Sequence, residues 1–325
     1  MNIKKPILII AAIIIVIVAF WGFQVLKPPE TRKVSATFSN EGVSAILQYT
    51  IEQLSLDKKH GLDLVSVKGD PGELERKLRN REVDIGGQST AALIKSNQEG
   101  FNIKIFAPYL TFSNSLLVKT DANYQSIDDL KGKKIGIVPK QSALYQTAAL
   151  EFRILGVNLE KDFKLSFGGQ SDLVEFLKKG EVDAAFVTTP LAAILVASGD
   201  YREVLDMGDL WVSIYGVPYF FLGRAAHADW LEKNKDIAKS FTAMSLEAAK
   251  YILDHPEFVA KYAREALNAK TQGEIDFLVK RLPKALPTSW DNKMIDNAVF
   301  VMQKAAEFGF IDKIPANSKE FFTQF

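Results

Sequence analysis

Four short polar loops each follow a predicted strand and precede a predicted helix. Their side chains are mainly hydroxyls and amides. The first backbone N–H groups of a helix have no partner within the helix, so such loops suit the polar or anionic groups of a ligand. We therefore expect a small polar or anionic solute, held mainly by neutral hydrogen-bond donors. The candidate ligand-binding residues are Ser39, Asn40, Glu41, Gly42, Gln88, Ser89, Thr90, Gln141, Ser142, Thr188 and Thr189.

Two alternatives stay open for these loops. Each hydroxyl could serve only as a helix cap, with Ser39 or Asn40 as the natural cap of the first helix. Lys140 is the cation best placed to meet an anion, whereas Glu41 in another loop would oppose one. The sequence does not decide which of these two charges faces the ligand.

The sequence offers no recognisable catalytic or metal-binding motif. His60, His227 and His255 are expected at the surface, at predicted helix ends, and none has metal-ligand spacing to another histidine or carboxylate. No nucleophile elbow, Walker loop or dinucleotide-binding glycine motif is present. Asp84 and Asp183 could form a carboxylate pair, but each comes just before a buried-looking strand and more simply caps a turn. We assign no catalytic residue, metal ligand or cofactor, and expect no enzyme.

Two segments 99 positions apart share one local pattern, which positions two of the polar loops. Residues 74–90 and 173–189 both contain a helical spacing of leucines, the sequence Glu-Val-Asp, a short apolar strand and a final Ser/Thr or Thr pair. Asn80 and Gly180 are the expected left-handed helix terminators. The alternative is coincidence in a chain rich in Leu, Glu and Val. If the repeat is real, it predicts two similar α/β lobes.

The order of elements predicts that the chain leaves one lobe and returns to it. Extended, aromatic-rich segments at 108–118 and 211–224 would be the two crossovers, and the helices after residue 228 would pack on the first lobe. This layout is typical of two hinged lobes that close on a ligand. The expected fold class is α/β. The predicted divisions are 27–32 as a tether, 33–112 with 218–325 as lobe 1, and 113–217 as lobe 2.

Composition narrows the location and the partners of the protein. The 40 basic and 39 acidic residues give a net charge of +1, so nucleic-acid binding is not expected. Cysteine is absent, which excludes disulfides, thiolate metal sites and a lipid-anchored Cys.

Lys4 and Lys5 precede an apolar run from Ile7 to Phe23, so residues 1–26 are predicted to be an uncleaved membrane anchor or a secretion signal. The rest of the chain would then lie outside the cytoplasmic membrane.

Three segments resemble a known family. They read SIDDLKGKKIGIVPKQSA from Ser126, LKKGEVDAAFVTTPLAA from Leu177 and LRNREVDIGGQSTAAL from Leu78. This combination resembles the nitrate/sulfonate/taurine-type substrate-binding proteins of ABC importers, close to the alkanesulfonate and thiamine-precursor branches. The resemblance implies a type II periplasmic-binding-protein fold and a monomer that hands its solute to a permease and its ATPase. It also implies that the crossover at Ser113 and Asn114 forms the floor of the cleft.

Two other functions remain conceivable for such a fold. One is an enzyme similar to the pyrimidine-synthesising relatives of this family, which would need a reactive cluster in the cleft. The other is an extracellular ligand sensor, although only about six residues would remain on the cytoplasmic side of the anchor.

Overall fold

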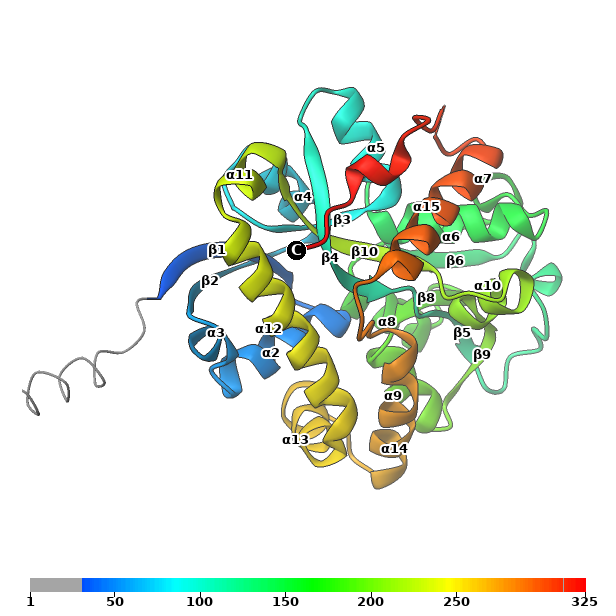
Figure 1. Cartoon of the computed structure of the whole chain (residues 1–325). Helices are drawn as coiled ribbons and strands as arrows, with labels where there is room; N and C mark the ends of the chain where they lie inside the picture. Colours follow the sequence, from blue (N-terminus) through cyan, green and yellow to red (C-terminus); the bar gives the residue numbers. More distant parts are fainter. Residues whose placement is uncertain (1–30, 312) are drawn as a thin grey trace, which may run out of the picture.

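The computed structural model describes residues 31–311 and 313–325 (Figure 1). The predicted anchor at residues 1–26, and all but the last two residues of the tether, lie outside this part of the chain. Within the described residues, no helix is both long and apolar enough to cross a membrane. Anchoring therefore stays a prediction.

The chain begins with a parallel pair of strands and continues into a three-stranded antiparallel sheet. β1 pairs with β2 in parallel, and β10 lies between β3 and β4. A bridge from Ala36 to Ile85 connects the two sheets. Because β10 comes more than 100 residues after β4, the chain returns to the sheet that it left. The elements are β1 (Arg32–Ser39), α2 (Gly42–Gln53), α3 (Leu56–Lys59), β2 (Leu62–Gly69), α4 (Pro71–Arg79), β3 (Gly86–Ser89), α5 (Thr90–Gln98), β4 (Ile103–Thr111) and β10 (Phe220–His227).

A five-stranded mixed sheet is formed by the residues between β4 and β10. Its strand order is β7-β6-β8-β5-β9, with β6 parallel to β7 and β8, and β5 antiparallel to both of its neighbours. The sheet is therefore built without any strand of the other two sheets. Its elements are β5 (Asn114–Lys119), η1 (Asp128–Leu130), β6 (Lys134–Ile137), α6 (Ala143–Ile154), α7 (Leu159–Asp162), β7 (Lys164–Phe167), α8 (Gln170–Lys179), β8 (Ala184–Thr188), α9 (Leu191–Ala197), β9 (Tyr201–Asp206) and α10 (Met207–Tyr215).

The C-terminal part is helical, as expected, and contacts both groups of sheets. α12 packs against α2 and β4, and α15 packs against α5 and β10. α14 instead packs against α9, beside the five-stranded sheet (Figure 1). The helical segment thus also connects the two groups of sheets. Its elements are α11 (Ala228–Lys233), α12 (Lys235–Asp254), α13 (Pro256–Ala266), α14 (Gln272–Arg281), η2 (Leu282–Lys284), α15 (Asn292–Glu307) and η3 (Ser318–Phe321).

The 99-residue repeat is present in the backbone hydrogen bonds. The N–H of Arg81 donates to the carbonyl of Leu78, and 99 positions later the N–H of Gly180 donates to that of Leu177. The left-handed residue of the first copy is Arg81 at φ 59°, so the prediction of Asn80 was wrong by one position. Asn80 still donates its N–H to a helix carbonyl, and the turn therefore closes one residue later.

The aspartates of the two copies bind the backbone of neighbouring strands. Asp84 Oδ2 accepts hydrogen bonds from the backbone N–H of Ser35 at 2.8 Å and from its hydroxyl at 2.7 Å. Asp183 Oδ2 accepts from the backbone N–H of Lys134 at 2.9 Å, again 99 positions later. Asp84 thus binds within β1, and Asp183 binds at the start of β6, so the two carboxylates serve different sheets. The two therefore do not form a catalytic pair.

The segment predicted to be extended from residue 211 to 224 begins as a helix. Asp206 caps α10 by accepting a hydrogen bond from the backbone N–H of Asp209 at 3.0 Å, and Gly216 ends it in a left-handed conformation. The ring of Trp211 packs against Tyr219, with 4.6 Å between centroids. The aromatic residues here were read as a strand pattern, but their spacing places Trp211 and Tyr215 on one helix face.

Candidate functional site

A cavity of about 690 Å³ opens between the five-stranded sheet and the other two sheets. Such a volume is in the range of small-molecule binding sites. Residues from the connections after β1, β2, β6, β7 and β8 contribute to it, and residues near the β4–β5 connection complete it. The ends of several strands therefore converge on one space, as in other open α/β sheets.

Most of the predicted ligand residues line this cavity. They come from both groups of sheets and from the crossover between β4 and β5. The lining includes Ser39, Asn40, Glu41, Gly42, Ser113, Asn114, Gln141, Ser142, Thr188 and Thr189.

Gln88, Ser89 and Thr90 do not line the cavity. Gln88 is buried and its Nε2 donates to the hydroxyl of Ser96 at 3.2 Å, while Ser89 caps α5 by accepting from the N–H of Ala92. Successive residues of a strand point to opposite sides, and it is Gly87 that contributes to the lining. For Ser89 the helix-cap alternative is thus what the structure shows.

Two buried amides present unused hydrogen-bonding groups to the cavity. The side chain of Asn114 is only 5% exposed and has no hydrogen bond to any described residue. Gln170, at 6% exposure, accepts at Oε1 from the backbone N–H and the hydroxyl of Thr188, which leaves its Nε2 without a partner among the described residues. Buried polar groups are normally satisfied, so these two indicate where a ligand would bind.

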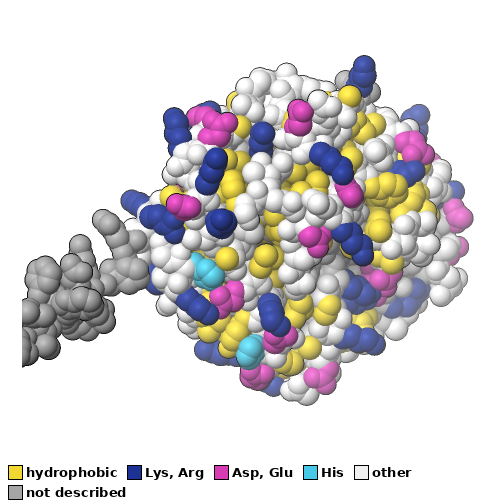
Figure 2. All heavy atoms as spheres, in the orientation of Figure 1, with side chains coloured by type: hydrophobic (Ala, Val, Ile, Leu, Met, Phe, Trp, Pro, Cys, Tyr) yellow, Lys and Arg dark blue, Asp and Glu magenta, His cyan; other side chains and the backbone are white. Residues whose placement is uncertain are grey.

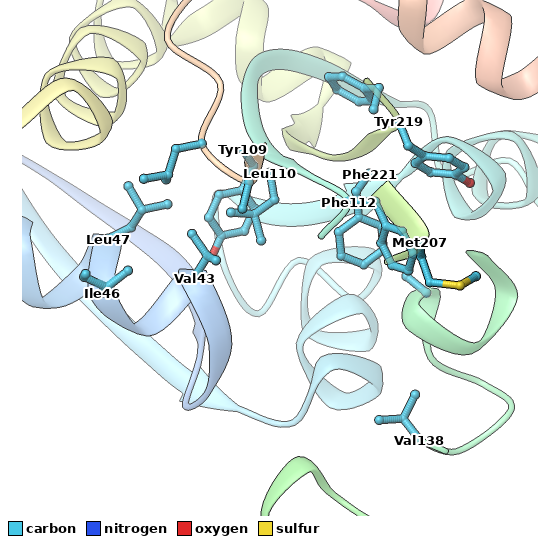
Figure 3. Packing of buried hydrophobic residues seen from close by; sticks show 14 of the residues in the cluster. Val43, Ile46, Leu47, Tyr109, Leu110, Phe112, Val138, Met207, Tyr219 and Phe221 are labelled. Atoms are coloured by element: carbon cyan, nitrogen blue, oxygen red, sulfur yellow. The ribbon is translucent and has the colours of Figure 1, made fainter. Parts of the chain in front are cut away.

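An aromatic wall forms another side of the cavity (Figure 3). Phe112 and Phe221 pack at 5.2 Å between ring centroids, and the hydroxyl of Tyr109 contacts that of Ser44. Apolar surface of this kind can bury the carbon skeleton of an organic solute.

Arg224 lies behind this wall and outside the lining. Its guanidinium is 3.4 Å from the ring centroid of Tyr109 and 4.4 Å from that of Phe38, and it donates to the carbonyl of Thr37 at 2.7 Å. No carboxylate of the described residues pairs with it. Burial lowers the pKa of Arg224 from its usual value. The aromatic rings therefore stabilise this cation.

The charged residues of the lining are all acidic: Glu41, Asp70, Glu73, Glu75 and Asp172 line the cavity, and no Lys, Arg or His of the described residues does. Lys140 instead pairs with Glu160 at 2.9 Å. Burial raises the pKa of Glu75 to about 7. Of the two charges that the sequence left undecided, Glu41 faces the cavity.

Sequence reasoning missed several lining residues. Gln170 follows β7 just as the predicted loops follow their strands, so the same rule would have found it. Glu75 lies on an ordinary amphipathic helix and carries no local signal.

A family model described as NMT1/THI5 like matches residues 56–258, which is more than half of the chain. The chain belongs to the NMT1/THI5-like family. No curated protein sequence matches the chain. The family match confirms the resemblance that the three sequence segments indicated.

Solved structures show the fold of this NMT1/THI5-like protein. The alkanesulfonate-binding protein SsuA from Xanthomonas axonopodis pv. citri, bound to MOPS, gives a TM-score of 0.72 at 12% identity, covering 91% of this chain and 99% of that one. SsuA from Escherichia coli gives 0.67 at 16% identity, covering 90% and 94%. The Candida albicans CA3427 gene product, which has the generic periplasmic-binding-protein fold, gives 0.65 at 16% identity, covering 89% and 96%. The predicted fold class is confirmed.

The histidines of this NMT1/THI5-like chain lie away from the cavity. His60 pairs with Glu247 at 2.8 Å, and His227 is buried, with ring nitrogens 2.8 and 2.9 Å from the carbonyl oxygens of Phe101 and Leu78. The expectation of a surface position was therefore wrong for His227. Among the described residues, no group of three His, Cys, Asp or Glu side chains is placed to hold a metal ion.

Proposed function

We propose that this protein is the extracytoplasmic solute-binding component of an ABC importer. The fold, the family match and the structural similarity to sulfonate-binding proteins all support this function. The observation that carries it is Asn114, a buried residue that lines the 690 Å³ cavity and whose amide has no hydrogen-bond partner among the described residues. Such a group is explained if a small organic solute completes its hydrogen bonds. The protein would then hand the solute to a permease driven by an ATPase.

The two predicted lobes, 33–112 with 218–325 and 113–217, would close on the solute as a hinged pair. In support, the loops from the two sides touch across the cavity. The hydroxyl of Ser171 donates to Glu41 at 3.1 Å, and a Cβ added to Gly42 would lie 3.7 Å from Thr188 Oγ1. These contacts across the cavity suit a closed arrangement of the two lobes.

Location follows from the same proposal. Residues 1–26 would hold the protein at the outer face of the cytoplasmic membrane, or would be removed as a signal during secretion. Fractionation of cells that express the full chain distinguishes an anchor from a cleaved signal. An anchored protein stays with the membrane at its full mass, whereas a secreted protein has lost the mass of its signal. A cytoplasmic protein would contradict both.

Binding of a solute is tested by thermal shift and calorimetry with a panel of sulfonates, nitrate, amino-pyrimidines, amines and aromatic acids. We expect at least one compound to raise the melting temperature of the wild type, and Asn114→Ala to weaken its binding about tenfold, as expected for a lost buried hydrogen bond of about 1.4 kcal/mol. The matched control is Asn80→Ala, an exposed position outside the cavity. Chemical conversion of the bound compound would instead indicate an enzyme.

A further inference from the structure

We infer that the solute carries a positive charge on an apolar or aromatic body, as a protonated amine or another organic cation. This inference rests on the proposed solute-binding function and names the class of solute. It replaces the negative charge expected from the helix starts with a positive one. Three features of the cavity support it: the sign of its charges, the position of these charges at the helix ends, and a buried amide that is independent of both.

The first feature is the sign of the charges. All five charged lining residues are acidic, and two of them, Asp70 and Glu75, have no ion pair or side-chain hydrogen bond within the described residues. Glu73 pairs with Lys77 at 3.2 Å, and Asp172 accepts from the N–H of Gly169. Asp70 and Glu75 are therefore the groups available to a cation.

The second feature is the helix ends, which carry carboxylates of their own. Four helices, α2, α4, α6 and α8, begin at the cavity. Their positive ends would favour an anion. However, Glu41 precedes α2, Asp70 and Glu73 lie at the start of α4, and Asp172 lies in the first turn of α8. Only α6 has neither an acidic first turn nor an acidic N-cap. An anion would therefore meet one unopposed helix end and five carboxylates.

The third feature is Asn114, which points to a ligand independently of the carboxylates. Its amide is nine-tenths buried, lines the cavity and lacks a partner among the described residues. It offers an acceptor as well as a donor, and so can bind an N–H group. Phe112 and Phe221 beside it provide an apolar surface for the body of the solute.

Arg224 limits where the cation can lie. Its guanidinium covers one face of Tyr109, so a second cation on this ring would be repelled. Glu75 and Asp70 belong to α4 and its N-cap, whereas Arg224 belongs to β10 and does not line the cavity. We therefore place the positive group of the solute beside α4.

The test uses three probes that share one body: 2-phenylethylammonium, 2-phenylethanol and 2-phenylethanesulfonate. Binding of these probes, and of wider sets of amines, neutral solutes and sulfonates, is measured by calorimetry. The measurements are made at pH 8, where Glu75 is ionised because its pKa is about 7. We expect the tightest compound to be a cation. Glu75→Gln should weaken its binding at least tenfold, while Glu181→Gln, an exposed position outside the cavity, should leave it unchanged.

The outcomes separate this inference from the proposed function. If an anion binds most tightly and its binding depends on Asn114, the function stands and the inference is wrong. If a cation binds but Glu75→Gln has no effect while the variant melts like the wild type, the assignment of the charge to α4 is wrong. If no compound binds, the proposed function fails, and the inference fails with it.

Discussion

Glu151 is a buried carboxyl group that the cavity does not use. It lies on α6, and neither of its oxygens has a hydrogen-bond partner within the described residues. Burial, with a smaller contribution from the charge of Asp206, raises the pKa of Glu151 well above its ordinary value of 4.5. The folded protein therefore keeps this side chain protonated at a pH at which the unfolded chain has released the proton.

This difference predicts a dependence of stability on pH. The folded state binds more protons than the unfolded state above about pH 4.5, so the free energy of unfolding should fall as pH rises, by up to about 1.4 kcal/mol per pH unit. Urea denaturation of Glu151→Gln, which cannot titrate, should show a flatter decline between pH 5 and 8. Parallel curves for variant and wild type would mean that Glu151 is ionised in the folded protein.

At the residue scale, sequence reasoning located hydrogen-bonding loops but not the side chains that matter most in them. Ser142 and Thr189 follow strands and do line the cavity, because a strand end fixes where the next loop lies. Asn114 came only from the family resemblance. Glu75 and Arg224 could not be found, since their roles depend on elements that are distant in sequence. Arg224 is buried against the ring of Tyr109, and Glu75 joins residues of other loops only in the cavity lining.

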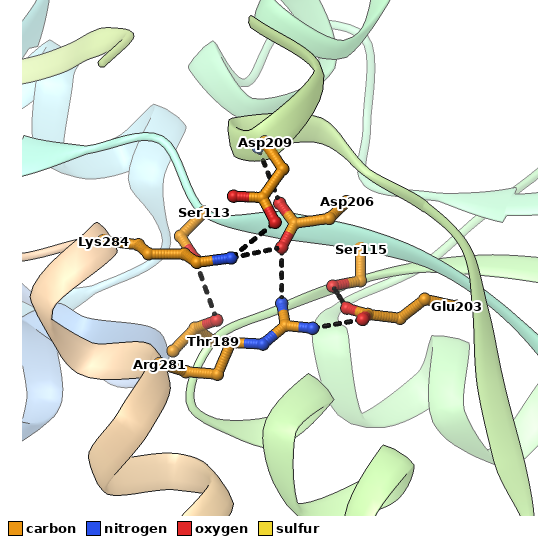
Figure 4. A network of polar contacts seen from close by, with 8 residues as sticks. All are labelled: Ser113, Ser115, Thr189, Glu203, Asp206, Asp209, Arg281 and Lys284. Carbon is orange, nitrogen blue, oxygen red and sulfur yellow. Dashed lines mark hydrogen bonds and ion pairs between the residues drawn. The ribbon is translucent and has the colours of Figure 1, made fainter. Parts of the chain in front are cut away.

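At the scale of elements, α14 and η2 connect both groups of sheets (Figure 4). Arg281 pairs with Glu203 and with Asp206, the latter at 2.7 Å, and both carboxylates belong to β9. Lys284 pairs with Asp206 at 3.2 Å and with Asp209 at 2.6 Å. The carbonyl of Lys284 accepts from the hydroxyl of Thr111 on β4. The segment is therefore bonded to strands of two different sheets.

Replacing Arg281 by Met should destabilise the protein by about 3 kcal/mol, because Glu203 and Asp206 would be left close together and poorly hydrated. The side chain of Arg281 is only 10% exposed, whereas that of Lys284 is 37% exposed. Lys284→Met should therefore cost about 1 kcal/mol or less. Chemical denaturation measures the loss of unfolding free energy in each variant. Equal losses would show that the difference in burial between Arg281 and Lys284 does not affect how much their ion pairs contribute to stability.

A glycine at the start of α10 tests how tightly this helix packs against the crossover. A Cβ at Gly208 would lie 2.7 Å from the backbone oxygen of Phe112, so Gly208→Ala should cost about 1–3 kcal/mol through overpacking. Gly273 occupies the second position of α14 and is exposed, with no atom closer than 3.9 Å to such a Cβ. Gly273→Ala should be neutral or slightly stabilising. A similar loss for both would contradict the contact with Phe112.

Local chemistry explains which elements the sequence predicted well. The repeat was recognised because helix ends and the Glu-Val-Asp turn are encoded by neighbouring residues. The helix α10 was read as a strand because its identity depends on the cap from Asp206 and on packing of Trp211 against Tyr219. Likewise, the attachment of α14 and η2 to β9 depends on ion pairs between residues 75 or more positions apart.

At the scale of the whole molecule, the surface gives no sign of a strongly charged partner. Figure 2 shows Lys and Arg side chains interspersed with Asp and Glu on the visible face, in keeping with the net charge of +1. The cavity lining differs, because its charged residues are all acidic. We therefore expect the acidic residues of the lining to attract the solute, and the mixed charges of the visible surface to attract neither a polyanionic nor a polycationic partner.

Closure of the two predicted lobes can be measured directly, because the chain has no native cysteine to interfere with labelling. Spin labels at Lys68→Cys on β2 and Lys164→Cys on β7 report the separation of the two groups of sheets, both positions being exposed. A solute should shorten and narrow this distance distribution, as expected for hinge closure. The control pair, Lys68→Cys with Glu99→Cys, lies within predicted lobe 1 and should not change.

The ion pairs of Arg281 allow a sharper form of this prediction. Residues 281–285 contact β4 and β9 beside the crossover at Ser113, so they lie where a hinge would bend. If these residues restrain the hinge, Arg281→Met should broaden the distance distribution measured without solute. Ser171→Ala removes the hydrogen bond to Glu41 across the cavity, so this variant should have a longer mean distance. An unchanged distribution in both variants, with solute still bound, would show that the solute enters a rigid cavity. In that case binding would not require the lobes to move.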